Sequence, residues 1–340
     1  WRNIYLHTML GIRKNRIGID LGTANILVYV AGRGIVLNEP TVVAARIDDN
    51  KVVAVGKDAK EMLGRTPGNI VATRPLKDGV IADYGITQQM LAYFIDKVCG
   101  RARFIKPEVM VCIPSGITQV EKRAVIDATM AAGASQVYLI DEPLAAAIGA
   151  KIPIAQATGH MILDIGGGTS DVAVISLGGV VIHKSIRVAG NKTEEAIANY
   201  IRKKFNLLVG ERTGEEIKIQ IGNAIPDPKD EKKLEVKGRD SVTGLPRSIE
   251  ISDREVHEVI IPILKMIVSV IRETFEATPP ELVSDILDKG IVLTGGASLL
   301  KNLDRYIAQE TGVPAYVAED PLYCVARGTG VALENLELYK

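Results

Sequence analysis

The chain has 340 residues, of which 47% are hydrophobic and 24% are charged, and its formal net charge at pH 7 is zero. This composition is typical of a soluble globular protein long enough for two domains, and the lack of a basic excess argues against nucleic acid as a partner. The three cysteines lie too far apart for a metal-binding motif, and no apolar run reaches the ~18–20 residues that span a membrane.

The first 15 residues combine apolar and basic side chains. Trp1, Ile4 and Met9 fall roughly on one face of a helix, and arginines and lysines accompany them. Such a segment can lie as an amphipathic helix on an anionic membrane surface, or it can be a tail without a fixed role. The segment does not have the uninterrupted apolar core of a secretory signal, so the sequence predicts a cytoplasmic protein.

Residues 16–40 predict a β-meander in which a glycine turn joins the first two strands. Asp20 ends the first strand, directly before this turn. Residues 41–82 then contain strands, a short helix and a loop, and they are interpreted as a small inserted subdomain. A helix with one apolar face is expected at residues 87–99.

Two large apolar residues, Phe104 and Ile105, follow this helix in a loop that is rich in cations. Exposed apolar side chains ringed by positive charge are suited to insertion into a lipid headgroup layer. The alternative is that Phe104 packs back onto the helix that precedes the loop. The sequence leaves both readings open.

Strands and helices alternate from residue 109 to residue 150, which predicts an α/β core with a mainly parallel inner sheet. Thr118 and Glu121 form a capping-box pattern, so a helix is expected to begin there. Glu142 and Pro143 precede an alanine-rich segment, and proline suits the first turn of a helix. The carboxylate of Glu142 is therefore expected at a helix N-terminus.

Residues 161–175 predict a second glycine hairpin, in which two apolar strands are joined by glycines at positions 166–168. Successive glycines cost backbone entropy, and the usual reason for them is close approach of a ligand to bare N–H groups. Asp164 leads this hairpin as Asp20 leads the first. The two hairpins together predict two halves of one site for a phosphate chain and its Mg²⁺, although either alone could be a tight structural turn.

The second half of the chain continues with a strand and several helices. Helices are expected at residues 193–204, 213–222, 253–276 and 321–336. Residues 223–253 are rich in proline and charge and predict a second small subdomain, and Pro262 is expected to kink the following helix or reset its start. A third glycine turn comes after a buried strand, and it leads to a predicted helix N-terminus at Ser298 that suits a flat ring or a phosphate.

Together these motifs resemble the superfamily of actin, sugar kinases and heat-shock chaperone ATPases, which combines two phosphate hairpins with a third glycine turn on the adenosine side. Within it, residues 16–340 resemble the MreB family of bacterial actins. The stretches that carry this resemblance are residues 18–25, 64–68, 74–83, 165–169, 210–213, 278–282 and 293–296.

The resemblance implies an α/β, actin-like fold, in which a ribonuclease H-like unit is duplicated. Two large domains each carry a smaller subdomain, and the nucleotide lies in the central cleft. The implied division is residues 1–15 as an N-terminal tail or amphipathic segment, 16–40 with 83–155 and 322–340 as subdomain IA, 41–82 as IB, 156–190 with 254–321 as IIA, and 191–253 as IIB.

The resemblance also implies the residues of the site. ATP or ADP is expected to contact Thr23, Ala24, Asn25, Gly166, Gly167, Gly168, Thr169, Glu215, Glu216, Ile217, Lys218, Thr294, Gly295, Gly296 and Ala297. Glu142 and Thr169 match residues that orient the attacking water, and Asp164 is the third catalytic candidate. Asp20 and Asp164 are expected to hold Mg²⁺, largely through water.

The implied function is that of a slow, Mg²⁺-dependent ATPase that polymerises into filaments, typically paired and antiparallel. Phe104 and Ile105 match a loop that inserts into membrane in relatives, so the filaments are expected at the inner face of the cytoplasmic membrane. The expected partners are further copies of the chain and proteins of morphogenesis and cell-wall synthesis. The expected role is support of cell shape and of organised cell-wall synthesis.

The chain departs from the family pattern at several positions. Asp141 stands where a glutamate is usual, Ala297 replaces a glycine of the third turn, and Asn191 and Lys192 replace an acidic pair. The methyl group of Ala297 is expected to alter nucleotide affinity. The alternatives on this fold are a small-molecule kinase, a non-polymerising ATPase and a chaperone-like module. A kinase would need a catalytic base for a substrate hydroxyl, and the sequence offers no candidate.

Overall fold

The structure is a computed structural model that describes residues 15–100 and 105–338. Residues 1–14 and Phe104, which include most of the predicted membrane-binding groups, lie outside the described residues. In the described part of the chain, every helix falls short of the length or apolarity that crossing a bilayer requires.

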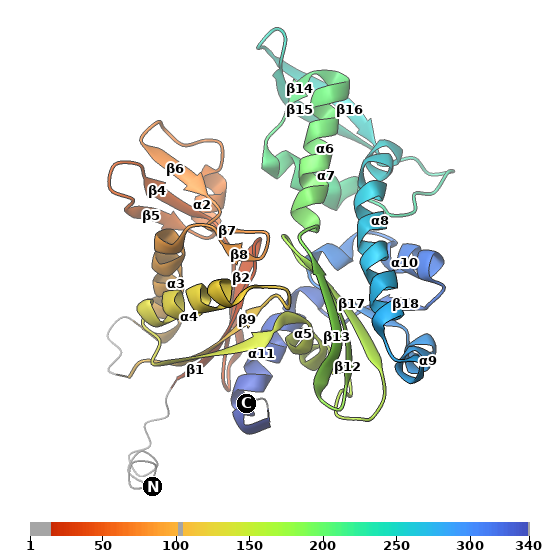
Figure 1. Ribbon diagram of the computed structural model, residues 1–340. Helices are drawn as coiled ribbons and strands as arrows, with labels where there is room; N and C mark the ends of the chain where they lie inside the picture. Colours follow the sequence, from red (N-terminus) through yellow and green to blue (C-terminus); the bar gives the residue numbers. More distant parts are fainter. Residues whose placement is uncertain (1–14, 101–104, 339–340) are drawn as a thin grey trace.

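Two five-stranded sheets of the same topology form the centre of the molecule (Figure 1). The first has the order β10-β9-β1-β2-β3 and contains β1 (Arg16–Leu21), β2 (Asn25–Val30), β3 (Gly34–Pro40), β9 (Glu108–Ile113) and β10 (Gln136–Asp141). The second has the order β13-β12-β11-β17-β18 and contains β11 (His160–Ile165), β12 (Ser170–Ser176), β13 (Gly179–Ile186), β17 (Ile291–Thr294) and β18 (Ala315–Val317). In each sheet an antiparallel three-stranded meander is extended by two parallel strands. The repeated arrangement is a duplication, as the two glycine hairpins suggested.

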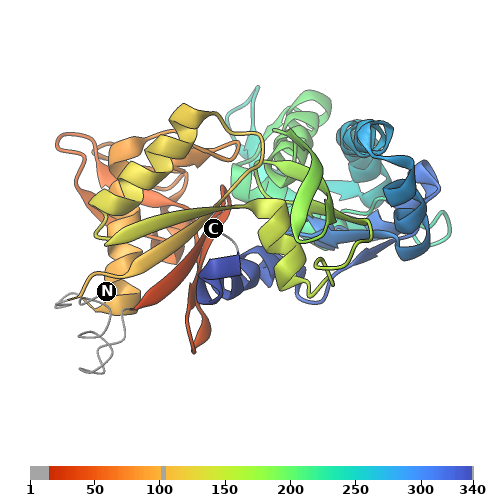
Figure 2. The same cartoon turned by 60° about the horizontal axis from the view of Figure 1, so that its bottom comes forward.

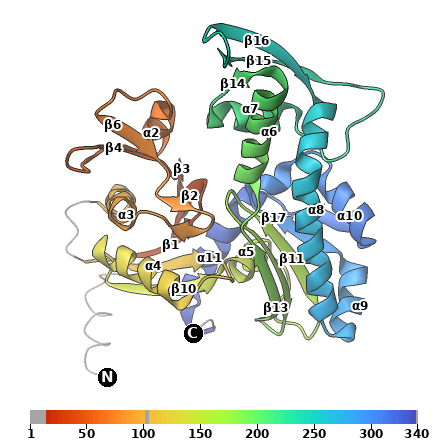
Figure 3. The same ribbon diagram turned by 45° about the horizontal axis from the view of Figure 1, so that its top comes forward.

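A small antiparallel sheet accompanies each large one, and both stand at the same end of the molecule (Figure 3). The first consists of β4 (Val43–Arg46), β5 (Val52–Val55) and β6 (Ile70–Thr73), with the short helix α2 (Lys57–Met62) packed on it. The second consists of β14 (Leu207–Leu208), β15 (Lys233–Asp240) and β16 (Pro246–Ser252). A two-stranded connection, β7 (Leu76–Lys77) and β8 (Val80–Ile81), returns the chain to the first large sheet. We call residues 15–141, with their large and small sheets and the helices packed on them, the first lobe. Residues 160–317, with the corresponding sheets and helices, are the second lobe.

Two helices cross between the large sheets (Figure 2), α5 (Glu142–Gly149) in yellow-green and α11 (Cys324–Glu334) in dark blue. Their backbones pack directly against each other, because Gly149 of α5 faces the backbone of α11 and Gly328 of α11 faces the backbone of α5. A Cβ atom at Gly328 would lie 1.7 Å from the carbonyl oxygen of Ala145, and one at Gly149 would lie 1.8 Å from that of Cys324. The two lobes therefore meet on a closely packed helical crossing that leaves no room for a side chain at either glycine.

The remaining helices cover the outer faces of the two lobes. They are α3 (Tyr84–Cys99), α4 (Gln119–Ala131), α6 (Gly190–Phe205), α7 (Glu211–Ile221), α8 (Asp253–Ala277), α9 (Pro280–Lys289) and α10 (Leu303–Thr311), with the 3₁₀ turns η1 (Gly296–Leu299), η2 (Pro321–Tyr323) and η3 (Leu336–Leu338). The predicted capping box at the start of α4 is present, since Thr118 and Glu121 bond reciprocally. α3 starts three residues before the predicted position because the Asp83 side chain accepts a hydrogen bond from the Ile86 amide.

Two predicted helix starts were wrong. Pro262 does not reset the start of α8, which begins at a capping box formed by Ser252 and Glu255 and continues through Pro262 to Ala277. Ser298 is not a helix N-terminus, because it lies inside the 3₁₀ turn η1 and its hydroxyl donates to the Gly295 carbonyl. Eight buried apolar residues hold α8 against the second lobe, which compensates for the missing amide of proline.

Candidate functional site

A cavity of about 450 Å³ lies between the two lobes, at the carboxyl ends of β1, β11 and β17. Both glycine hairpins and the third glycine turn line it. The predicted site residues that line the cavity are Asp20, Thr23, Ala24, Asn25, Glu142, Asp164, Gly166, Gly167, Gly168, Thr169, Glu215, Lys218, Gly295, Gly296 and Ala297. The fold thus brings together residues that lie up to about 280 positions apart in the chain, as expected for a ligand site at strand ends.

Three predicted nucleotide contacts do not line the cavity. Ile217 is 1% exposed and belongs to the apolar core of the second lobe, and Glu216 turns outward to pair with Arg212 at 2.8 Å. Helical periodicity explains this, because positions 215, 218 and 219 of α7 share one face and positions 216 and 217 do not. Thr294 is fully buried behind the cavity, where its hydroxyl donates to Asp164 at 2.7 Å. Its contact is with the carboxylate, rather than with the cavity.

The two glycine hairpins touch each other across the cleft, which gives a second reason for their glycines. A Cβ atom at Gly168 would lie 2.5 Å from the hydroxyl of Thr23, and one at Gly167 would lie 2.7 Å from the methyl group of Ala24. The Thr23 hydroxyl also accepts a hydrogen bond from the Gly79 amide at 3.0 Å. Glycine at these positions is therefore required by the contact between the hairpins, in addition to any ligand.

Three carboxylates converge on the floor of the cavity: Asp20 from β1, Asp164 from β11 and Glu142 from the N-terminus of α5. Burial raises the pKa of Asp20 to about 6 and that of Asp164 to about 7. Burial, together with the negative charges of Asp171, Asp164 and Asp20, raises the pKa of Glu142 well above its ordinary value. Burial is the largest cause for each group, and repulsion from neighbouring carboxylates adds to it at Asp164 and Glu142.

This carboxylate cluster has little compensation from the protein. Thr294 donates to Asp164, and the thiol of Cys112 donates to Asp20 at 3.4 Å. Among the described residues, no lysine or arginine forms an ion pair with Asp20, Asp164 or Glu142, and no side-chain hydrogen bond involves Glu142. Hard oxygen ligands with uncompensated negative charge are the donors that Mg²⁺ prefers, so the residues present fit that ion.

Sequence reasoning missed several residues that line or support the cavity. Glu194, in the first turns of α6, is buried and pairs with Lys218 at 2.5 Å. Glu194 lies one helical turn after Gly190, and the Gly190 amide donates a hydrogen bond to the Gly166 carbonyl of the second hairpin. Residues four apart share one helix face, so this spacing could have indicated that Glu194 faces the site. Asp171, fully buried on β12, contributes to the raised pKa of Glu142. No local pattern in the sequence marks Asp171, which reads as an ordinary polar position in a strand.

The positions that depart from the family pattern lie close to the site. Asn191 lines the cavity, and its backbone N–H donates a hydrogen bond to the Gly167 carbonyl at 2.8 Å. Ala297 also lines it, beside Gly190. Lys192 points to the surface and pairs with Glu195 at 3.0 Å. The predicted membrane residue Ile105 lies outside this site, half-buried in the loop before β9.

The sequence matches one family model along almost its whole length. That model is described as MreB/Mbl protein and covers residues 14–340. The cell shape-determining protein MreB of Escherichia coli (strain K12) is 52% identical over 335 residues, which cover 97% of this chain and 96% of that protein. The cell shape-determining protein Mbl of Bacillus subtilis (strain 168) is 51% identical over 321 residues, which cover 94% of this chain and 96% of that protein.

Solved structures agree with this match. MreB5 of Spiroplasma citri bound to ADP superposes with a TM-score of 0.89 at 38% identity, covering 95% of this chain and 98% of that one, and the same protein has been solved with AMPPNP. MamK in a double helical filament, at 21% identity, has the same fold with a TM-score of 0.80. The predicted actin-like fold is therefore confirmed, and the chain belongs to the MreB/Mbl family.

Proposed function

We propose that this protein is an ATP-binding and ATP-hydrolysing bacterial actin that polymerises into filaments and supports cell shape. The observation that carries the proposal is the interlobe cavity, where two Asp-led glycine hairpins and a third glycine turn surround an uncompensated carboxylate cluster. Relatives about half identical to the chain are named as cell shape-determining proteins, and MreB5 has been solved with ADP and with AMPPNP. These names and titles support the same function here.

The cavity offers a distinct surface for each part of ATP. Backbone amides and hydroxyls of residues 23–25 and 166–169 would hold the phosphate chain between the two hairpins. Glu215 and Lys218, on the cavity face of α7, would meet the ribose and base, and residues 295–297 would lie against the adenosine. Asp20 and Asp164 would hold Mg²⁺, largely through water, and the ion would neutralise charge on the phosphates.

Hydrolysis would require a water molecule aligned with the terminal phosphate. Glu142 lies on the cavity floor, and Thr169 lines the same cavity from the second glycine hairpin. Both groups would orient the water, and the carboxylate of Glu142 would accept its proton, so the protein's contribution is mainly positioning and charge stabilisation. The Mg²⁺ charge next to Glu142 would favour the ionised carboxylate that proton acceptance needs.

The proposal extends to assembly and location. Filaments would form from copies of this chain, paired in antiparallel fashion, and would lie on the inner face of the cytoplasmic membrane. The cationic loop that contains Phe104 and Ile105 and the basic N-terminal segment would provide two weak membrane anchors acting together. Proteins of morphogenesis and cell-wall synthesis would then bind the membrane-attached filament.

Calorimetric titration with ATP tests the nucleotide part of this proposal. In the presence of Mg²⁺ we expect one ATP per chain, with EDTA weakening the affinity about ten-fold or more, because the carboxylate cluster then faces the phosphates without a cation. At about 100 times the dissociation constant, ATP should stabilise the fold by about 2.7 kcal/mol. A chain that binds no ATP in either condition would contradict the assignment of the cavity.

A further inference from the structure

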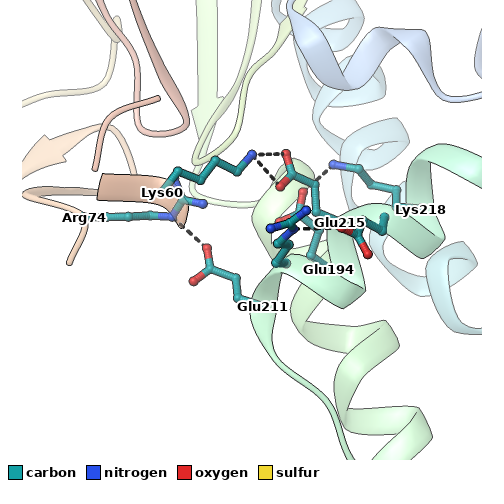
Figure 4. A network of polar contacts seen from close by, with 8 residues as sticks. Lys60, Arg74, Glu194, Glu211, Glu215 and Lys218 are labelled. Carbon is teal, nitrogen blue, oxygen red and sulfur yellow. Dashed lines mark hydrogen bonds and ion pairs between the residues drawn. The ribbon is translucent and has the colours of Figure 1, made fainter. Parts of the chain in front are cut away.

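Two ion pairs cross from the first lobe to the second at the outer edge of the cavity (Figure 4). Lys60 on α2 places its Nζ 2.7 Å from Oε2 of Glu215 and 3.0 Å from Oε1, so it contacts both carboxylate oxygens. The Nε of Arg74 lies 2.7 Å from Oε1 of Glu211. Both glutamates belong to α7 of the second lobe, so these pairs join segments that are more than 130 residues apart.

Lys60 and Arg74 of the first lobe neutralise glutamates of the second lobe. The α6–α7 side of the contact carries three glutamates, Glu194, Glu211 and Glu215. Lys218 pairs with Glu194 at 2.5 Å, which leaves two glutamates to be neutralised by Lys60 and Arg74. The charge of Arg74 also reaches Glu194, where it favours the ionised carboxylate. Without these two cations, net negative charge would face the site proposed for a polyanionic nucleotide.

The contact between the lobes is open at this place. A second cavity of about 370 Å³ separates α2 from α7, and most of the side chains that line it are charged. The paired side chains are partly exposed, from 16% for Arg74 to 49% for Glu211. Attraction between charges therefore supplies the cohesion here, and partly exposed ion pairs are weak enough to open on thermal fluctuation.

One side chain links these pairs to the nucleotide cavity. Glu215 lines both the large cavity and the second cavity beside α2, so Lys60 fixes the position of a residue in the wall of the large cavity. We propose that Lys60 and Arg74 form a clasp between the lobes, and that opening of this clasp sets the lifetime of the bound nucleotide. The inference rests on the proposed nucleotide binding and adds two positioning residues that lie outside the cavity itself.

Release of a fluorescent ADP analogue tests the clasp. The protein is loaded with the analogue and Mg²⁺, then mixed with excess ATP, and the loss of fluorescence gives the release rate. Lys60→Gln and Arg74→Gln remove the charge and keep a polar side chain, and we expect the double variant to release the analogue about three- to ten-fold faster. Arg65→Gln is the matched control, because Arg65 is exposed on the same subdomain and has no ion pair among the described residues.

Ionic strength and charge reversal separate the clasp from a general loss of stability. Raising salt from about 0.05 M to about 0.5 M should speed release from the wild-type protein, because screening weakens partly exposed pairs, and should affect the double variant less. Arg74→Glu alone should speed release, and adding Glu211→Arg should restore it. Neither residue lines the nucleotide cavity, so restoration would come from the interlobe pair.

Three outcomes would count against these inferences. If the wild-type protein does not bind the analogue, nucleotide binding fails and the clasp fails with it. If it binds, but the glutamine variants and Arg74→Glu release the analogue at the wild-type rate, the clasp alone is wrong. A charge-swapped protein that releases as fast as Arg74→Glu would likewise overturn it.

Discussion

Replacing Glu142 with glutamine is expected to slow ATP hydrolysis by about 100-fold or more while leaving ATP affinity within about two-fold of the wild-type value. The amide keeps the size of the side chain and its place at the start of α5, but it cannot accept a proton from water. Among the described residues, no side-chain hydrogen bond or ion pair involves Glu142, so the substitution breaks no such bond that supports the fold.

Single-turnover hydrolysis measured beside equilibrium binding tests this expectation. Glu61→Gln is a suitable control, because Glu61 is exposed on α2 and remote from the carboxylate cluster. Thr169→Ala should also slow hydrolysis, by a smaller factor, since its hydroxyl aligns the water and does not accept the proton. Hydrolysis by Glu142→Gln at the wild-type rate would remove Glu142 from the mechanism, and weakened ATP binding would assign it to the binding site.

Replacing Asp20 with asparagine is expected to stabilise the nucleotide-free protein at pH 8. The folded-state pKa of Asp20, about 6, is raised above the ordinary value of 3.8, so the folded state disfavours the ionised form. This penalty is absent below the ordinary pKa, grows as the pH rises toward 6 and is complete above it. Asparagine removes it, and the gain at pH 8 should be about 1–3 kcal/mol.

Thermal unfolding in EDTA from pH 4 to pH 8 measures this gain. Asp20→Asn and the wild-type protein should unfold at similar temperatures near pH 4, and the variant should be the more stable at pH 8. With saturating Mg²⁺ and ATP the order should reverse, because the variant lacks a ligand for the ion. An Asp20→Asn protein that is less stable than wild type at pH 8 without nucleotide would show that the carboxylate supports the empty fold.

The parts of the site that could be predicted from sequence are those built from local patterns. A strand, an aspartate and a glycine turn form a recognisable unit, and its repetition at Asp20 and Asp164 pointed to two halves of one cavity. Glu142 could be placed at a helix start because Pro143 follows it. Short-range physics fixes each of these features, so they survive folding largely unchanged.

The parts that could not be predicted depend on contacts between distant segments. Glu194 becomes a cavity residue only because α6 packs beside the second hairpin, and Lys60 meets Glu215 only because the two small sheets stand at the same end of the molecule. Charged residues in surface helices are ordinarily solvated, and nothing in the local sequence marks these as partners. Glu216 and Ile217 differ from these cases, since helical periodicity alone would have separated them from Glu215 and Lys218.

High-speed sedimentation with Mg-ATP, with Mg-ADP or without nucleotide, each with and without anionic liposomes, tests the central claim most directly. A nucleotide-dependent filament protein with weak membrane anchors should pellet with Mg-ATP, and liposomes should increase the pelleted fraction. Phe104→Ser with Ile105→Ser should reduce the liposome effect and leave the nucleotide effect. A protein that binds ATP and yet stays in the supernatant in every condition would contradict polymerisation and would indicate a monomeric ATPase or kinase on the same fold.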